Sequence, residues 1–339
     1  MLSLCPQCVR WAAAGSLVPW PSRTTTQSTR TRTRTQRARS RPTQTSSSES
    51  VRKPSRTGRP RPHRDLVYLA DPTHQYQYRN HEQQNTPSIR VMMWNILAQG
   101  RSCSLEALIW AERKYMEQIL SYRPDILCLQ EVDHNYDTFH PILASLGYHS
   151  TFLPKPWSPC LDVASNNGPD GCALFYRRSC FSLLHTSHLH LSSMMLPTNQ
   201  VAVVQTLCCR ATGQRLCVVV THLKARSGWE RLRVARGGGA SDSVFNAEPS
   251  ENVYRRFTSS ALGLDSAYKL LCTDGQTEPA FTTWKIRPSG ESCSTLDYIW
   301  YSHGSFTVDT LLDIPTEEEL RPDRLPLIPL PLRPPLTAL

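Results

Sequence analysis

From residue 89 onward, short apolar runs alternate with polar breaks, and this pattern predicts a folded domain. The apolar run 89–94 ends at Asn95, and the run 126–129 leads into Glu131. Both runs have the length of a buried strand. Between them, residues 104–123 carry apolar side chains at helical spacing, with a serine at the start and a proline directly after the end. The pattern therefore predicts strand, helix and strand in succession.

The remainder of the domain is mostly strand-like. Further strands are expected at residues 148–153, 172–176, 181–184, 200–209, 215–223, 296–301 and 306–312, and helices at 136–146, 252–257 and 266–271. Strands that follow each other without room for a crossover helix favour antiparallel pairing. Two early helices followed by many strands predict an α+β sandwich, with two packed sheets and helices outside.

The positive charge of the chain belongs to its N-terminal arm. Residues 1–64 contain 14 Lys and Arg and one acidic residue, whereas the other 275 residues contain 24 bases and 27 acids. The domain is therefore close to neutral, which does not support a general nucleic-acid surface. We divide the chain into a disordered basic tail (1–86), in which residues 66–69 could be locally ordered, a domain (87–325) and a proline-rich tail (326–339).

The first 48 residues contain eight Arg and no acidic residue, and they are rich in Ser and Thr. This is the composition of a mitochondrial transit peptide, although an ordinary disordered tail fits equally well. No stretch approaches the length of a membrane span. Many of the 12 cysteines lie within strand-like runs, which indicates buried free thiols in an intracellular protein.

Several polar residues stand where apolar strands end, and together they suggest hydrolytic chemistry. Asn95, Glu131, His222 and Asp297 occupy such positions, and Asn246 lies in a loop. Taken singly, each is better explained as a solvated or satisfied polar group. As a set they offer the oxygens that a hard metal ion prefers, together with a histidine. This combination suits metal-assisted hydrolysis of a phosphate ester.

Four basic residues of the domain could hold substrate phosphates, although each alone is adequately explained as a solvated charge. They are Lys155, Lys224, Arg226 and Arg287. Asp133 and His134 lie past the strand and are expected to be exposed. His185, His188 and His190 do not have the spacing of a zinc site.

Six motifs resemble the exonuclease–endonuclease–phosphatase superfamily and, within its deadenylase-like branch, the nocturnin family. The similarity extends with gaps from about residue 89 to 325. The motifs are Met93-Trp-Asn-Ile-Leu-Ala-Gln99, Leu129-Gln-Glu-Val-Asp133, Pro154-Lys-Pro-Trp-Ser-Pro-Cys160, Thr221-His-Leu-Lys-Ala-Arg226, Phe245-Asn-Ala-Glu-Pro249 and Leu296-Asp-Tyr-Ile-Trp300.

The resemblance implies a four-layered α/β sandwich like that of DNase I and Mg²⁺-dependent hydrolysis. Glu131 would bind the metal, and Asn95, His222, Asn246 and Asp297 would complete the catalytic set. The substrate pocket would include Lys155, Pro156, Trp157, Asn199, Lys224, Arg226 and Arg287. The implied reaction removes the 2′-phosphate of NADP(H), and poly(A) shortening of mRNA is the alternative. Mitochondria, cytoplasm and nucleus are the implied locations.

The chain also departs from the family pattern at three places. A shorter segment is absent after Ala98-Gln99. Before Phe245 the family has an apolar strand ending in Gly-Asp, with a catalytic Asp, whereas residues 237–243 read Gly-Gly-Gly-Ala-Ser-Asp-Ser and Val244 occupies the Asp position. The family ends in a Ser-Asp-His motif, whereas a proline-rich segment follows Arg324 here. We therefore expect a fold that is incomplete near residues 237–245 and at the C-terminus, and a polypeptide that is inactive or poorly folded. Mis-splicing or mis-assembly of the sequence, or evolution into a non-catalytic binding protein, would account for these departures.

Overall fold

The structure is a computed structural model. It describes residues 7–13, 66–69, 88–96, 98, 105–162, 168–193, 196–223, 242–244, 246–287 and 290–317. All of these residues belong to one compact unit, which comprises residues 1–16 and 63–339.

The larger sheet has seven strands, and its centre positions two of the candidate residues. Its order is β2 (Leu66–Tyr68), β16 (Phe306–Leu312), β1 (Gln7–Ala13), β3 (Ser88–Asn95), β4 (Ile126–Val132), β6 (Gly171–Arg177) and β5 (Tyr148–Pro154). Strands β3 and β4 are parallel, with Asn95 paired to Gln130. The carboxyl ends of the two strands therefore lie at the same edge of the sheet, which brings Asn95 next to Glu131.

The second sheet has five strands and contributes the histidine. Its order is β14 (Asp297–Tyr298), β10 (Asp242–Val244), β9 (Arg215–His222), β8 (Leu196–Cys209) and β7 (Phe181–Ser193). Two smaller pairs complete the strands, β11 (Leu264–Ser266) with β15 (Trp300–Ser302) and β12 (Thr283–Arg287) with β13 (Gly290–Ser294).

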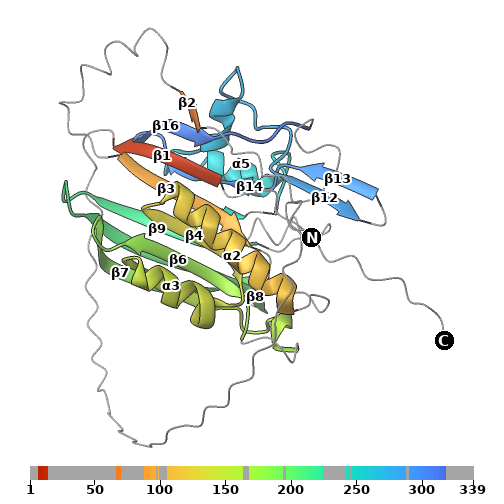
Figure 1. Ribbon diagram of the computed structural model, residues 1–339. Coiled ribbons are helices and arrows are strands. Elements are labelled where there is room, and N and C mark those ends of the chain that lie inside the picture. The colour runs from red at the N-terminus through yellow and green to blue at the C-terminus, as the bar shows by residue number, and fades with distance from the viewer. Residues whose placement is uncertain are drawn as a thin grey trace, which may run out of the picture. The chain divides into compact units, whose positions relative to one another are not determined.

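Helices cover one face of the seven-stranded sheet. Figure 1 shows α2 (Leu105–Tyr122) and α3 (His140–Ser145) on the same side of β3, β4 and β6. The other helical elements are η1 (Asn135–Phe139), η2 (Pro159–Asp162), α5 (Asn252–Thr258) and η3 (Ala267–Leu271). None of the described helices combines the length and apolarity that a membrane span requires.

Two apolar cores follow from the alternation of side chains along β4. Ile126 and Cys128 face a core that also contains Val203 of β8 and Val220 of β9, so the two sheets share it. Leu127 and Leu129 face the opposite side, where they join side chains of α2 and α3. All four of these β4 side chains are fully buried. This two-sided burial explains why the strand is a continuous apolar run rather than an alternating one.

The structure confirms most of the elements that the apolar pattern predicts. Strand β7 is longer than predicted, because the mostly polar residues 185–193 continue the pairing with β8. The helix predicted at residues 266–271 is a 3₁₀ helix that follows the short strand β11. The two sheets and their helical layer agree with the predicted mixed α/β fold, while the fourth layer of the sandwich stays a prediction.

The sequence predicts that a central strand is missing near residues 237–245, and this prediction is wrong for residues 242–244, which form strand β10. Strand β10 lies between β9 and β14, with Val244 paired to His222 on one side and to Asp297 on the other. Asp242 and Ser243 have weak strand propensity, but they form a strand here because both neighbouring strands offer backbone hydrogen-bonding groups that would otherwise be unpaired. Residues 224–241, which precede β10, lie outside the described part of the chain.

Two segments of the predicted N-terminal tail also belong to the larger sheet. Strand β1 lies between β3 and β16, and β2 pairs with the outer side of β16. The local order predicted at residues 66–69 is confirmed by β2, whereas the prediction of a disordered tail is wrong for residues 7–13. Short runs flanked by basic and proline-rich sequence carry little local signal, and the partners that pair with them are far away in the chain. The C-terminal tail, residues 326–339, lies outside the described residues.

Gly171 permits the close approach of β5 and β6 next to the candidate site. A Cβ atom at this position would lie 2.8 Å from the Cα of Pro154 and would also meet the backbone of Leu153. We expect Gly171→Ala to lower the free energy of unfolding by about 3 kcal/mol, because backbone atoms cannot move aside as a side chain can. Urea denaturation measures the change. Gly304→Ala is the matched control, since its Cβ would meet nothing within 4 Å, and equal losses in both variants would contradict the prediction.

A proline at residue 243 tests whether β10 is formed in solution. Ser243 is the middle residue of this strand and pairs with Thr221 and Tyr298. Proline removes its backbone N–H from an interior strand, so we expect Ser243→Pro to cost about 3 kcal/mol of stability. Ser243→Ala keeps the N–H and serves as the control. Identical urea midpoints for the two variants would show that residues 242–244 do not pair.

Candidate active site

Glu131 stands on a strained backbone at the end of β4. Its φ angle is +54°, in the left-handed region that costs a residue with a side chain about 1–3 kcal/mol. Strand β6 pairs with Gln130 and Val132 but passes over Glu131, so Glu131 is the extra residue of a β-bulge. The bulge interrupts the alternation of side chains and turns the Glu131 carboxylate out of the sheet, where it is 21% exposed.

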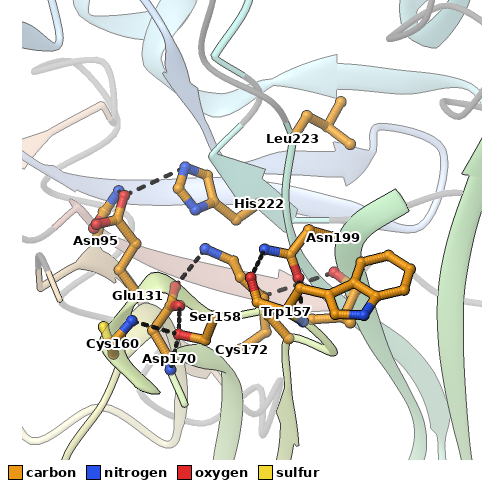
Figure 2. A network of polar contacts seen from close by, with 12 residues as sticks. Asn95, Glu131, Trp157, Ser158, Cys160, Asp170, Cys172, Asn199, His222 and Leu223 are labelled. Atoms are coloured by element: carbon orange, nitrogen blue, oxygen red, sulfur yellow. Dashed lines mark hydrogen bonds and ion pairs between the residues drawn. The ribbon is translucent and has the colours of Figure 1, made fainter. Parts of the chain in front are cut away.

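Three predicted residues meet at this carboxylate, and they come from three strands (Figure 2). The Asn95 side-chain amide donates a hydrogen bond to Glu131 Oε1 over 3.0 Å. Nε2 of His222, at the end of β9, lies 3.6 Å from the same oxygen. The His222 side chain is only 9% exposed. The packing of the two sheets therefore joins an amide, a carboxylate and an imidazole that are far apart in the sequence.

Lys155 extends the site with a positive charge. It follows the last residue of β5, and its ammonium pairs with the Asp170 carboxylate, which also accepts a hydrogen bond from Ser158 Oγ. Burial alone would lower the pKa of Lys155, but the nearby carboxylates of Asp170 and Glu131 more than offset it and raise that pKa. Lys155 is therefore a permanent cation beside Glu131.

Two buried thiols near these groups stay protonated. Burial raises the pKa of Cys172 to about 12, although the charge of Lys155 opposes the shift. Burial likewise raises the pKa of Cys160 to about 11. Because the thiolate is the nucleophilic form, neither cysteine is suited to attack a phosphate. The site is suited to hydrolysis by water rather than to a cysteinyl intermediate.

Asn246 and Asp297 lie on the β10 side of His222. Asn246 has a φ of +49°, and its side-chain amide donates to the carbonyl of Leu223, next to His222, over 2.8 Å. Asp297 is 8% exposed and accepts a hydrogen bond from the Thr282 hydroxyl over 3.2 Å. The β10 register places residue 244 between His222 and Asp297. Two of the three described non-glycine residues with positive φ, Glu131 and Asn246, are thus predicted site residues.

Trp157 and Asn199 form a second, more exposed part of the predicted pocket. The Trp157 backbone N–H donates to Asn199 Oδ1 over 2.8 Å, and the Asn199 amide donates back to the Trp157 carbonyl over 2.5 Å. This reciprocal pair fixes the backbone of the loop while the Trp157 side chain remains 58% exposed. Pro156 is exposed in the turn between Lys155 and Trp157.

Three predicted basic residues are not placed relative to the site. Lys224 and Arg226 lie outside the described residues, and only the backbone of Arg287, the last residue of β12, is described. Asp133 and His134 are buried, at 8% and 9% exposure, which corrects the prediction that they are exposed. The His134 ring pairs with the Asp137 carboxylate at the start of η1 over 2.8 Å, so a local turn buries it.

Asp170 and Ser158 were not predicted as site residues. Both residues lie in the long loop between β5 and β6, where polar residues are abundant and a single acidic side chain carries no signal. One clue was present, since Asp170 directly precedes the apolar run of β6. Because β6 is antiparallel to β4, a polar residue at the start of β6 lies at the same edge of the sheet as one at the end of β4.

The donors at Glu131 fit a hard cation of small size. Among the described residues there is no cluster of three or more His, Cys, Asp or Glu that could hold a metal. Mg²⁺ does not need such a cluster, because it keeps several waters and is commonly held by one or two carboxylates together with a substrate phosphate. One carboxylate beside an amide therefore suits Mg²⁺ better than Zn²⁺, which requires several nitrogen or sulfur ligands.

Comparison with known proteins agrees with this geometry. Residues 94–214 match the model of the Endonuclease/Exonuclease/phosphatase family. The chain is 52% identical to nocturnin of Xenopus laevis over 290 residues, which cover 78% of this chain and 73% of the frog protein. It is 22% identical to the exoribonuclease subunit Ccr4 of the Candida albicans CCR4-Not complex over 219 residues, 60% of this chain and 28% of that protein.

A solved structure shows the same relationship. The human nocturnin catalytic domain with bound sulfate anion superposes with a TM-score of 0.63 at 49% identity, covering 75% of this chain and 91% of that domain. The motifs around Glu131 and His222 and the extent of these matches lead to one conclusion. The chain belongs to the nocturnin family of phosphoester hydrolases within the endonuclease/exonuclease/phosphatase superfamily.

Proposed function

We propose that this protein hydrolyses a phosphate monoester with the help of Mg²⁺, and that the substrate is the 2′-phosphate of NADP(H), which yields NAD(H). The observation that carries the proposal is the meeting of Asn95, Glu131 and His222 at one carboxylate oxygen, with the Lys155 cation close by. A monoester phosphate needs compensation of its negative charge and donors for its oxygens. These residues supply both.

Each residue has a separate task in this reaction. His222 is placed to donate from Nε2 to a phosphate oxygen, and Lys155 offsets the charge of the phosphate. Asn95 holds the Glu131 carboxylate in one orientation through its 3.0 Å hydrogen bond. Glu131 would hold Mg²⁺, which would supply polarisation of the phosphoryl oxygen and stabilisation of the charge that develops there. The human relative with its bound sulfate anion supports the proposal, since sulfate has the shape and charge of a phosphate group.

The charge balance of the domain favours a small substrate over a long RNA. Outside its first 64 residues the chain carries 24 bases and 27 acids. Binding a long polyanion through many phosphates requires clustered positive charge, whereas one dinucleotide requires a few cations. The exposed Trp157 ring, on a loop fixed by Asn199, is a suitable surface for a nucleotide base.

Poly(A) shortening is the second candidate, because the chain is also similar to the exoribonuclease subunit Ccr4. A non-catalytic role is the third, because Val244 stands where the family pattern has a catalytic Asp. One set of assays separates the three.

Phosphate release from NADP⁺ by the purified full chain is the primary test. The absence of an Asp at residue 244 lowers the expected rate, and we expect the release that remains to require Mg²⁺ and to fall by about three orders of magnitude in Glu131→Ala, because the variant lacks the metal-binding carboxylate. Lys285→Ala, on β12, serves as a control variant. Shortening of a poly(A) RNA without phosphate release from NADP⁺ would favour the deadenylase. Absence of both activities in a chain that melts cooperatively would favour the non-catalytic role.

Restoring a carboxylate at residue 244 should increase the rate. The β10 register places this residue between His222 and Asp297, so an Asp there joins the catalytic set. We expect Val244→Asp to raise kcat for NADP⁺ on the order of a hundredfold, since a positioned acid–base group commonly contributes that much. Val244→Asn is the isosteric control and should give no comparable gain. Equal rates in both variants, with native melting curves, would show that β10 does not present residue 244 to the substrate.

A further inference from the structure

The ion pair between Lys155 and Asp170 is buried, although it lies beside the proposed phosphate site. The exposed fraction of the two side chains is 11% for Lys155 and 4% for Asp170. Taking two charges out of water is costly, and a buried pair is often no more stabilising than apolar side chains of similar size. Stability alone is therefore a weak reason for charges at this position.

The contacts of Asp170 show that it is itself held in place. Its carboxylate accepts hydrogen bonds from the Ser158 hydroxyl and from Lys155. Its backbone N–H donates to Ser158 Oγ over 2.9 Å. Its carbonyl accepts a hydrogen bond from the Lys155 backbone N–H, also over 2.9 Å. Cys160 N–H also donates to Ser158 Oγ, over 3.2 Å. Side-chain and backbone bonds thus tie the start of β6 to the loop after β5 (Figure 2).

A lysine side chain by itself does not hold its charge in one position. It has a flexible four-carbon stem and a compact ammonium that turns freely. A fixed carboxylate behind the ammonium removes this freedom before substrate arrives, which reduces the entropic cost of binding. The other carboxylate that acts on the charge of Lys155 is Glu131. The ammonium is therefore paired with Asp170 and is also within electrostatic reach of the proposed metal-binding residue.

We propose that Asp170, supported by Ser158, is a positioning residue that fixes the Lys155 ammonium for the 2′-phosphate and so determines the preference for NADP⁺ over NAD⁺. This inference rests on the proposed function. Asp170 does not contact the substrate and acts only through Lys155. Removal of its charge should therefore weaken recognition of the 2′-phosphate while leaving contacts with the rest of the dinucleotide intact.

Equilibrium binding of NADP⁺ and of NAD⁺ to the full chain tests the inference. The binding is measured by isothermal titration calorimetry, with EDTA present to prevent turnover. The dissociation constant of NAD⁺ divided by that of NADP⁺ reports recognition of the 2′-phosphate alone. We expect Asp170→Asn, which keeps the shape and the acceptor for Ser158, to reduce this ratio about tenfold or more. Asp125→Asn is the matched control, since Asp125 pairs with Arg177 at the opposite end of β6, and it should leave the ratio unchanged.

A double-mutant cycle separates positioning from a structural role. Lys155→Met should reduce the ratio at least as much as Asp170→Asn, and adding Asp170→Asn to Lys155→Met should reduce it no further. An Asp170→Asn effect that persists without Lys155, or an unchanged ratio in folded Asp170→Asn, would overturn the inference. Equal affinity of the unmodified chain for NADP⁺ and NAD⁺ would instead overturn NADP(H) as the substrate, and the inference with it.

Discussion

The backbone at Glu131 is the constraint on which the rest of the site depends. A regular strand would alternate its side chains between the two buried faces, and a carboxylate at this point would enter an apolar core. The bulge and the left-handed φ of +54° release Glu131 from that alternation. Asn95 then reaches it from the parallel neighbour β3, and His222 reaches it from the other sheet. The strain is tolerated because completely buried neighbours on β4 hold the strand on both faces.

Much of this arrangement could be predicted from the sequence, because it depends on local patterns. The apolar runs around residue 90 and residue 128 identify the central strands, and polar residues at their ends identify Asn95 and Glu131. His222 follows from the same rule applied to β9. The bulge itself could not be predicted, since nothing in the sequence around Glu131 distinguishes a bulged strand end from a regular one.

Features that depend on distant partners were missed. Strand β10 forms because β9 and β14 offer backbone groups on both sides, although Asp242 and Ser243 do not form strands readily. The pairing of Asp170 with Lys155 depends on the fold, and the sequence shows only that Asp170 precedes the apolar run of β6. Strand pairing at residue 244 preserves the backbone of the family fold, but it cannot supply the carboxylate that Val244 lacks. Fold and chemistry are thus separable at this position.

The central claim is that the bulge presents Glu131 to a cation while His222 and Lys155 receive the phosphate. A crystal structure of the full chain soaked with Mn²⁺ and inorganic phosphate tests it most directly, because anomalous scattering locates Mn²⁺ without ambiguity. We expect an anomalous peak at the Glu131 carboxylate and a phosphate in contact with both His222 and Lys155. Mn²⁺ bound away from Glu131, or phosphate in contact with neither basic residue, would contradict it.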